Sequence, residues 1–198
     1  MFYANAAVAI ERKGDYMLAA DNRIYTIDDI ENLPEGERAE LIDGKIYYMS
    51  SPRLIHQRLS VELSTRIFNY IKEKGGSCEV LPAPFAVFIN KDRHNYVEPD
   101  ISVICDKTKL DERGCHGAPD WVIEIVSPSS RQMDYYRKLF KYSSAGVREY
   151  WIVDPERNRV WVYNFETEEL QDCTFADSVK AGIYEDFYID FSELPVEV

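Results

Sequence analysis

The sequence predicts a mixed α/β fold, in which helices pack against a central β-sheet. Three observations lead to this class. An Asp-Gly pair separates two short strand-like runs, one long segment places an apolar residue at every fourth position, and a strand, a helix and a second strand follow one another in the second half of the chain. Helices that alternate with strands in this way are typical of a sheet whose apolar faces are covered by helices.

The first elements expected are a short helix and a hairpin. Thr26 and Asp29 have the spacing of a capping box, which predicts the start of a helix at this point. The Asp-Gly pair at 43–44 predicts a two-residue turn, because both residues tolerate the backbone conformation that such turns require. We therefore expect residues 40–42 and 45–49 to pair as antiparallel strands.

A long amphipathic helix is expected after the hairpin. Ser51, which precedes a proline, is its expected N-cap, and the Gly-Gly pair at 75–76 is expected to end it. His56 lies in its first turns, next to the apolar stripe. The stripe that predicts this helix consists of Ile55, Leu59, Leu63, Ile67 and Ile71.

The second half of the chain supplies most of the predicted sheet. The run at 78–90 is broken by prolines and is expected at a sheet edge or around a bulge, where a missing N–H is tolerated. The other segments expected here are strands at 97–106, 121–127 and 148–154, a loop at 107–120 and a helix at 131–145. The strand, helix and strand from 121 to 154 predict a crossover between parallel strands. Short strands are expected to complete the chain.

Length and composition favour one globular domain. The chain has 198 residues, of which 45% are hydrophobic and 29% charged, and this suits a single core. We expect residues 25–198 to form the domain and residues 1–24 to be an N-terminal extension. No run has the pattern of a signal peptide or the length of a membrane span, so we expect a soluble cytoplasmic protein without a membrane partner.

The net charge of −12 argues against a protein that coats nucleic acid through bulk positive charge. It leaves open a local basic groove, or a site in which metal ions offset acidic side chains.

The four cysteines form no CxxC pair, and their spacing does not fit a zinc ribbon. We expect reduced thiols in a reducing compartment. Cys115 beside His116 is a weak signal for metal, and we interpret it as a free thiol in a loop.

An acid within the apolar run at 121–127 is the first sign of a functional site. Side chains alternate along a strand, so Glu124 shares a face with Val122 and Val126, where a buried charge needs a partner. Asp100 begins the preceding predicted strand, and neighbouring strands lie only about 4.8 Å apart. Two converging carboxylates repel each other, and a divalent cation bound by both removes the repulsion. A few oxygen ligands with open positions suit Mg²⁺ or Mn²⁺.

A lysine on the following helix can reach the same point. Asp134 and Lys138 are four residues apart, so they share one face of the helix expected at 131–145. Beside the two acids, the ammonium group would stabilise a developing negative charge or orient a water molecule.

These residues resemble the PD-(D/E)xK motif of nucleases. Pro99-Asp100 is followed by Glu124, although Val126 stands where the motif usually has lysine. Some branches of that superfamily carry the lysine on the next helix, where this chain has Lys138. The stretches "AELIDGKIYYMS", "VEPDISVI", "EIVSPSS" and "GVREYWIVDP" together are similar to one branch, the Uma-two family, from about residue 25 to residue 195.

The resemblance implies a restriction-endonuclease-like core, with a central mixed sheet flanked by helices. It also implies hydrolysis of phosphodiester bonds in DNA, with Mg²⁺ or Mn²⁺ as cofactor. Carried over by position, Asp100 and Glu124 are metal ligands, Glu40 completes the metal shell, and Lys138 orients the water or neutralises the phosphate. His56 is a further family-like position with a less defined role. A homodimer is expected by analogy, since two sites cut two strands most simply.

Each of these residues also has a purely structural interpretation. Glu124 can belong to an ion pair inside the sheet, and Glu40 can be an exposed strand end. Lys138 can pair with Asp134 on the surface, where such a pair contributes only about a few tenths of a kcal/mol. His56 fits a surface or capping role in its helix better than a catalytic one.

Other residues of the predicted helix at 131–145 fall into two groups. Arg137 and Lys141 are spare candidates for phosphate contact. The aromatic residues are expected to pack against the sheet, and they are Tyr135, Tyr136, Phe140 and Tyr142.

Three functions compete on this basis. The first is a metal-dependent DNA endonuclease, which the intact acids favour. The second is a protein of the same fold that binds nucleic acid or a protein partner and cuts weakly or not at all, which the net charge and Val126 favour. The third is a different metal-dependent hydrolase that uses the same acids.

Overall fold

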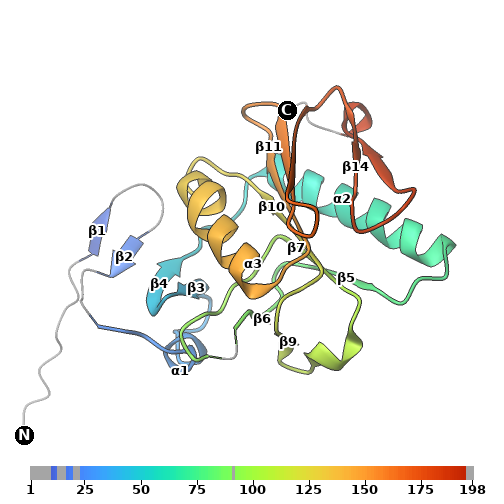
Figure 1. Ribbon diagram of the computed structural model, residues 1–198. Helices are drawn as coiled ribbons and strands as arrows, with labels where there is room; N and C mark the ends of the chain where they lie inside the picture. Colours follow the sequence, from blue (N-terminus) through green and yellow to red (C-terminus); the bar gives the residue numbers. More distant parts are fainter. Residues whose placement is uncertain (1–9, 13–16, 20–22, 91, 195–198) are drawn as a thin grey trace, which may run out of the picture.

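A six-stranded mixed sheet forms the centre of the protein (Figure 1). The computed structural model describes residues 10–12, 17–19, 23–90 and 92–194. In spatial order, the strands are β13 (Glu169–Thr174), β12 (Arg159–Asn164), β11 (Glu149–Asp154), β10 (Trp121–Ile125), β7 (Ile101–Ile104) and β5 (Glu79–Pro82). β10 and β11 are parallel, as expected for the predicted crossover, and all other neighbouring strands of this sheet are antiparallel. The mixed α/β class is therefore confirmed, and so is the edge position of β5.

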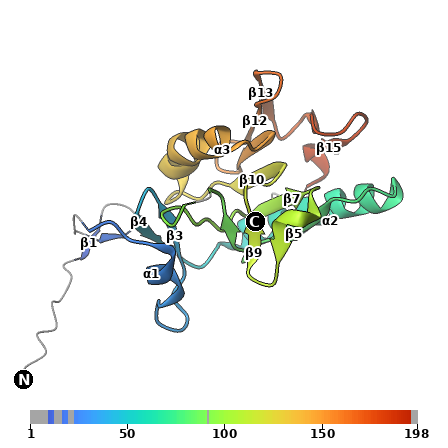
Figure 2. The same cartoon turned by 60° about the horizontal axis from the view of Figure 1, so that its bottom comes forward.

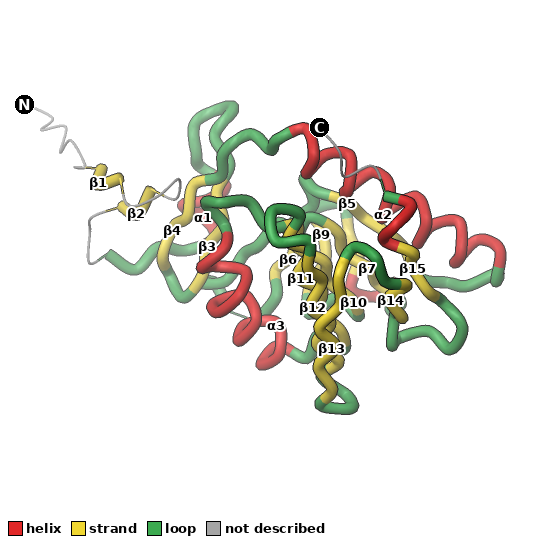
Figure 3. The backbone as a smooth tube through the Cα atoms, turned by 90° about the horizontal axis from the view of Figure 1, so that it is seen from above, coloured by secondary structure: helices red, strands yellow, loops and turns green. Residues whose placement is uncertain are grey.

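Helices cover both faces of this sheet, as seen from above in Figure 3. Helix α2 (Leu54–Glu73) lies on one face. The helical segments η2 (Met133–Lys138) and α3 (Leu139–Ala145) lie on the other. The predicted stripe of α2 is confirmed, because Leu59, Leu63, Ile67 and Ile71 are buried and Ile55 packs against them. The predicted cap is wrong, since Arg53 and not Ser51 occupies the N-cap position.

The alternation predicted for β10 is also confirmed. Trp121, Ile123 and Ile125 belong to the core cluster on the α2 side. Val122 and Val126 belong to the cluster on the η2–α3 side, and Glu124 shares this face by alternation.

The helix expected at 131–145 has two different hydrogen-bond patterns. Residues 133–138 form the π-helical segment η2, and the chain then continues as α3 until Gly146, whose φ of 93° ends the helix. π-helical turns are rare in proteins, and those that do occur often lie at functional sites. The buried residues of η2 are Met133, Asp134 and Lys138, so this segment turns two charged side chains toward the interior.

The predicted hairpin is formed by β3 (Ala39–Ile42) and β4 (Lys45–Tyr48). Its turn has φ values of 52° at Asp43 and 71° at Gly44, as a two-residue hairpin turn requires. Helix α1 (Ile27–Glu31), which begins at the predicted capping box, packs against this hairpin (Figure 2).

Two short strands from the predicted N-terminal extension join the hairpin. They are β1 (Ile10–Arg12) and β2 (Met17–Ala19), and β2 pairs with β4. The rest of residues 1–22 lies outside the described residues, and the domain boundary at residue 25 stays a prediction.

The loop predicted at 107–120 contains regular structure, so that prediction is wrong. A short helix, η1 (Lys107–Lys109), is followed by β8 (Leu110–Asp111) and β9 (Gly114–His116), which form a three-stranded sheet with β6 (Val87–Phe88). Gly114 makes the close approach possible, because a Cβ there would stand 2.3 Å from the carbonyl oxygen of Ala86. Strands this short carry too few residues for a periodic signal.

Short elements complete the α2 side of the core, as expected for the end of the chain. They are β14 (Ser178–Lys180), β15 (Tyr188–Asp190) and η3 (Phe191–Glu193). No helix among the described residues is long and apolar enough to cross a membrane.

The expectation of four reduced thiols is wrong for one pair. Cys78 and Cys105 form a disulfide between the ends of β5 and β7. The register of these strands places Glu79 opposite Ile104, so the two cysteines that flank this pair face each other. Cys115 and Cys173 are free.

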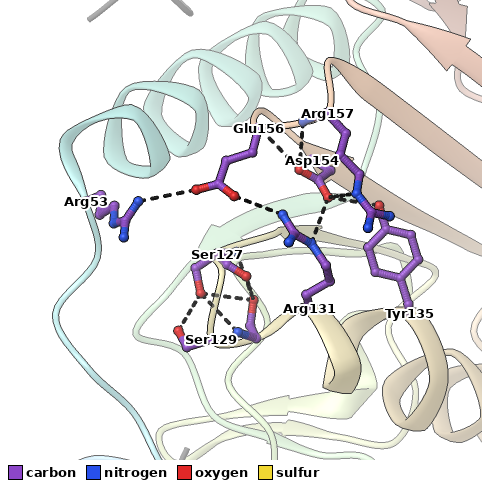
Figure 4. Close-up of polar contacts among 9 residues, drawn as sticks. Arg53, Ser127, Ser129, Arg131, Tyr135, Asp154, Glu156 and Arg157 are labelled. Carbon is purple, nitrogen blue, oxygen red and sulfur yellow. Dashed lines mark hydrogen bonds and ion pairs between the residues drawn. The ribbon is translucent and has the colours of Figure 1, made fainter. Parts of the chain in front are cut away.

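A charged network at the end of β11 joins the segments that frame one edge of the sheet (Figure 4). Asp154 is fully buried and accepts hydrogen bonds from Arg131, from Tyr135 and from the backbone N–H groups of Glu156 and Arg157. Arg131 also pairs with Glu156 at 3.0 Å, and Glu156 pairs with Arg53 at 3.3 Å. The network thus links β11, the start of the η2 helix and the start of α2.

We expect Asp154→Ala to lower the free energy of unfolding by about 1–3 kcal/mol, because it leaves partly buried donors without their acceptor. Urea denaturation followed by circular dichroism measures this change. Asp172→Ala is the matched control. Asp172, on the exposed strand β13, pairs with Arg159 of β12, and exposed pairs of this kind contribute less than about 1 kcal/mol. Equal effects of the two substitutions would contradict the central role of Asp154.

A second buried acid, Glu149, lies at the start of β11 and accepts a hydrogen bond from Trp151 Nε1. Burial raises the pKa of Glu149 to about 7, although hydrogen bonds from Trp151 and from the backbone of Gly182 and Ile183 oppose the shift. The folded protein therefore binds this proton more tightly than the unfolded chain does. The resulting stability is complete below the ordinary pKa of 4.5 and is lost as pH rises toward 7.

We expect Glu149→Gln to remove this pH dependence. Relative to the wild type, the free energy of unfolding of the variant should increase by up to about 3 kcal/mol between pH 4.5 and pH 8. Denaturation curves across this range test the shift, and Glu169→Gln on the exposed strand β13 controls for the loss of one negative charge. A constant difference between Glu149→Gln and the wild type at all pH values would disprove the prediction.

Candidate functional site

The predicted acids meet at one cleft beside β10. β7 and β10 are antiparallel, with Ile101 opposite Ile123, so Asp100 at the start of β7 lies next to Glu124 near the end of β10. The cleft has a volume of about 260 Å³. One wall is the segment 48–53 between β4 and α2, and the other is the serine loop 127–130 between β10 and the following helix.

The serine loop is held by its own hydrogen bonds (Figure 4). Ser127 N–H donates to Ser130 Oγ at 2.9 Å, and the Oγ atoms of Ser127 and Ser129 lie 2.8 Å apart. Hydroxyl groups therefore line this wall in a fixed arrangement.

Lys138 stands at the base of the cleft and is almost fully buried, with 4% of its side chain exposed. Its Nζ lies 2.9 Å from Glu124 Oε1, 2.9 Å from Glu40 Oε2 and 3.8 Å from Asp134 Oδ1. One ammonium group thus joins acids from β3, from β10 and from its own helix.

Further donors fix these acids. Tyr142 donates a hydrogen bond to Glu124 Oε1 at 2.6 Å, and the backbone N–H of Glu98 donates to Glu40 Oε1 at 3.0 Å. Both oxygens of Glu40 therefore have partners, and Glu40 is fully buried.

The cluster contains more negative than positive charge. Burial, together with Asp100, Asp134 and Glu40, raises the pKa of Glu124 well above its usual range, although Lys138 opposes the shift. Burial likewise raises the pKa of Asp134 to about 7, again against the effect of Lys138. For Lys138, burial lowers the pKa, but the surrounding acids outweigh it and hold the pKa well above its ordinary value. One lysine does not neutralise all of these carboxylates, so the site favours a proton or a second cation.

Asp100 is oriented by two donors on one of its oxygens. Its Oδ2 accepts from His56 Nε2 at 3.0 Å and from the backbone N–H of Ile125 at 2.7 Å. Burial lowers the pKa of His56, but its hydrogen bond with Asp100 and the negative charge there raise it by more, so the net shift is upward. His56 is mostly buried and lines the cleft, so the expectation of a surface or capping histidine is wrong.

An arginine and an acid lie farther along the cleft. Arg38 precedes β3, and its Nε donates to Glu98 Oε2 at 3.0 Å while Nη2 contacts the same oxygen. Tyr96 donates to the other oxygen of Glu98 at 2.8 Å. Glu98 is buried, whereas 40% of the Arg38 side chain is exposed.

The structural interpretations of two predicted residues fail. Glu40 is not an exposed strand end, and Lys138 is not part of a surface pair, since both are buried in the cluster described above. Val126, at the usual position of the lysine, packs in the core.

The spare candidates for phosphate contact are not among the residues that line the cleft. Arg137 donates to Tyr47 at 2.6 Å, and Lys141 pairs with Asp43. His116 pairs with Asp111. Among the described residues, no group of three or more His, Cys, Asp or Glu side chains is placed to hold a metal ion.

Some expectations about aromatic residues are wrong. Tyr136 and Phe140 were expected to pack, yet each is more than two thirds exposed. Tyr142 does pack, and it also takes part in the site through Glu124. The helical spacing of Tyr142 and Lys138, four residues apart, is the sequence signal that could have linked them. No comparable signal marks Arg38 or Glu98, whose contact spans 60 residues of sequence.

The donor set fits a hard divalent cation such as Mg²⁺. Asp100 Oδ1 and Glu124 Oε2 have no hydrogen-bond partner among the described residues, and both side chains line the cleft. Mg²⁺ is commonly held by one or two carboxylates, with water and substrate phosphate as its other ligands. No three His, Cys, Asp or Glu side chains in the described part of the chain are gathered as a complete metal site. The three-ligand set with Glu40 is therefore not assembled here.

Comparisons with known proteins show the family and the fold to which this cleft belongs. The model of the Uma2 (Uma-two) family, described as "Putative restriction endonuclease", matches residues 27–196. An uncharacterized protein of Synechocystis sp., slr1290, is 30% identical over 129 residues. That match covers 65% of this chain and 66% of the relative, just under two thirds of the relative's length.

A solved structure shares the fold. It is the crystal structure of a protein from Anabaena variabilis that is described as a putative nuclease belonging to DUF820. The TM-score is 0.70 at 22% identity, and the match covers 85% of this chain and 96% of that one. With the family model spanning nearly all of residues 25–198, the chain belongs to the Uma2 family of restriction-endonuclease-like proteins.

Proposed function

We propose that the protein is a metal-dependent endonuclease that hydrolyses phosphodiester bonds of DNA. The observation that carries this proposal is the convergence of Asp100, Glu124 and Lys138 on one cleft, with an unused carboxylate oxygen on each acid. Membership of the Uma2 family supports the same class of reaction.

Asp100 and Glu124 would hold Mg²⁺ or Mn²⁺, which lowers the pKa of a bound water and offsets the charge of the phosphate in the transition state. His56 and the N–H of Ile125 fix the Asp100 carboxylate, and Tyr142 fixes that of Glu124. Residues that orient ligands in this way commonly raise metal affinity.

Lys138 supplies positive charge beside the attacking water or the phosphate. Glu40 belongs to the support of this lysine, because one of its oxygens contacts Nζ and the other is bound by the Glu98 N–H. We therefore propose that Glu40 positions Lys138 and is not a ligand of the metal.

The charge of the cleft makes DNA binding dependent on metal. The cleft lining contains three Lys or Arg side chains and four Asp or Glu side chains, a formal charge of −1 with neutral histidine. A divalent cation changes this to +1, which suits a phosphate. In a homodimer, two such clefts would cut both strands.

We expect Asp100→Ala and Glu124→Ala to abolish cleavage of supercoiled plasmid, and each to weaken Mn²⁺ binding measured by calorimetry. The reason is that each substitution removes one of two protein ligands. Asp172→Ala, remote from the cleft, should cut as the wild type does. Circular dichroism shows whether each variant is folded.

A wild type that binds Mn²⁺ but cuts no nucleic acid with Mg²⁺ or Mn²⁺ would overturn the nuclease proposal. It would favour the alternative, a protein of this fold that binds nucleic acid or a protein partner without cutting. Cleavage that persists in EDTA would show that the reaction needs no divalent metal.

We expect Lys138→Gln to lower the rate of cleavage by about 100-fold or more while Mn²⁺ binding persists, because Asp100 and Glu124 remain and the positive charge beside the phosphate is lost. Circular dichroism and thermal unfolding must show a folded variant, since Lys138 also joins three buried acids. Lys141→Gln is the matched control from the same helix, since Lys141 pairs with Asp43 away from the cleft. Single-turnover rates give the comparison. If both variants cut equally fast, Lys138 is not the catalytic lysine.

A further inference from the structure

Arg38 differs from the other arginines near the cleft in how firmly it is held. Two of its nitrogen atoms contact Glu98 Oε2, and Glu98 is itself buried and bound by Tyr96. Arg53, by contrast, makes one contact of 3.3 Å with Glu156, and both of these side chains are exposed. A planar guanidinium fixed in this way loses little conformational freedom when it binds an anion.

The guanidinium of Arg38 retains donors for a ligand. Nη1 has no partner among the described residues, 40% of the side chain is exposed, and Arg38 lines the same cleft as Asp100 and Lys138. Glu98 occupies one edge of the guanidinium, so the remaining edge can donate to an oxyanion.

The position of Arg38 relative to the Lys138 cluster indicates which phosphate Arg38 could bind. The carbonyl oxygen of Arg38 accepts from the N–H of Met49 at 2.8 Å, so the pairing of β3 with β4 extends to this residue. Arg38 and Glu40 are two residues apart and therefore on one side of the strand, about 7 Å apart along it. This is close to the separation of neighbouring phosphates along a nucleic-acid strand.

We propose that Arg38, held by Glu98, binds the phosphate next to the scissile one on the same strand. The inference rests on the proposed nuclease function and adds a substrate-positioning residue to it. The Lys138 cluster would then act on one phosphate while Arg38 fixes its neighbour. The strand would run along the cleft from the serine loop toward Glu98.

Binding of a fluorescein-labelled oligonucleotide, with Ca²⁺ in place of Mg²⁺, tests the contact without cleavage. Arg38→Ala should raise the Kd about tenfold near 0.1 M salt. The slope of log K against log salt should fall by about 0.9 for a duplex or about 0.7 for a single strand, the effect of one lost phosphate contact. In plasmid cleavage, the KM should rise more than kcat falls.

Two further variants separate binding from folding. Arg38→Lys should restore the salt slope only in part, because an ammonium group cannot contact Glu98 and a phosphate with the same geometry. Arg93→Ala is the matched control, since Arg93 pairs with Asp28 on a different surface and should leave both Kd and slope unchanged. Thermal unfolding of each variant confirms that the fold is intact.

The outcomes distinguish this inference from the function on which it rests. A wild type that cuts DNA, with the Kd and slope of folded Arg38→Ala equal to its own, would overturn the role of Arg38 alone. Equal losses in Arg38→Ala and Arg93→Ala would mean a general charge effect and would also overturn it. A wild type that neither binds nor cuts nucleic acid would overturn both proposals.

Discussion

The buried ammonium group of Lys138 is the interaction on which the rest of the site depends. It joins Glu40 of β3, Glu124 of β10 and Asp134 of its own helical segment, so it connects the hairpin, the central sheet and η2. A buried charge without partners is costly, and partners from three elements satisfy it only when all three are in place. The arrangement proposed for catalysis and the packing of these elements therefore form together.

Comparison with Asp154 supports the proposed functional role of the Lys138 cluster. Asp154 is a single buried acid that several donors surround, and its hydrogen bonds account for its charge. Around Lys138 the balance is the reverse, since several acids share one lysine and the Oδ1 atom of Asp134 has no hydrogen-bond partner among the described residues. An excess of buried negative charge lowers stability unless a cation or a proton enters, which is typical of sites built for function.

The sequence predicted those parts of the site that periodic patterns reveal. The alternation of β10 placed Glu124 on the correct face, and the spacing of Asp134 and Lys138 placed the lysine on the correct side of its helix. It did not reveal the burial of Glu40 or the contact of Arg38 with Glu98, because such contacts depend on how distant segments meet. The disulfide between Cys78 and Cys105 was not predicted for the same reason, since the register of β5 and β7, and not the spacing of the cysteines, brings the two residues together.

The acidic character of the chain constrains how the proposed site would bind DNA. In the proposed function, a net charge of −12 disfavours binding of DNA through a broad basic surface, so the contacts with DNA would be few and local. The proposed site meets this requirement, because its carboxylates would bind a cation and the guanidinium of Arg38, held by Glu98, lines the same cleft. Repulsion from the rest of the acidic surface would then disfavour DNA that is not seated in the cleft, and this repulsion would itself be a source of selectivity.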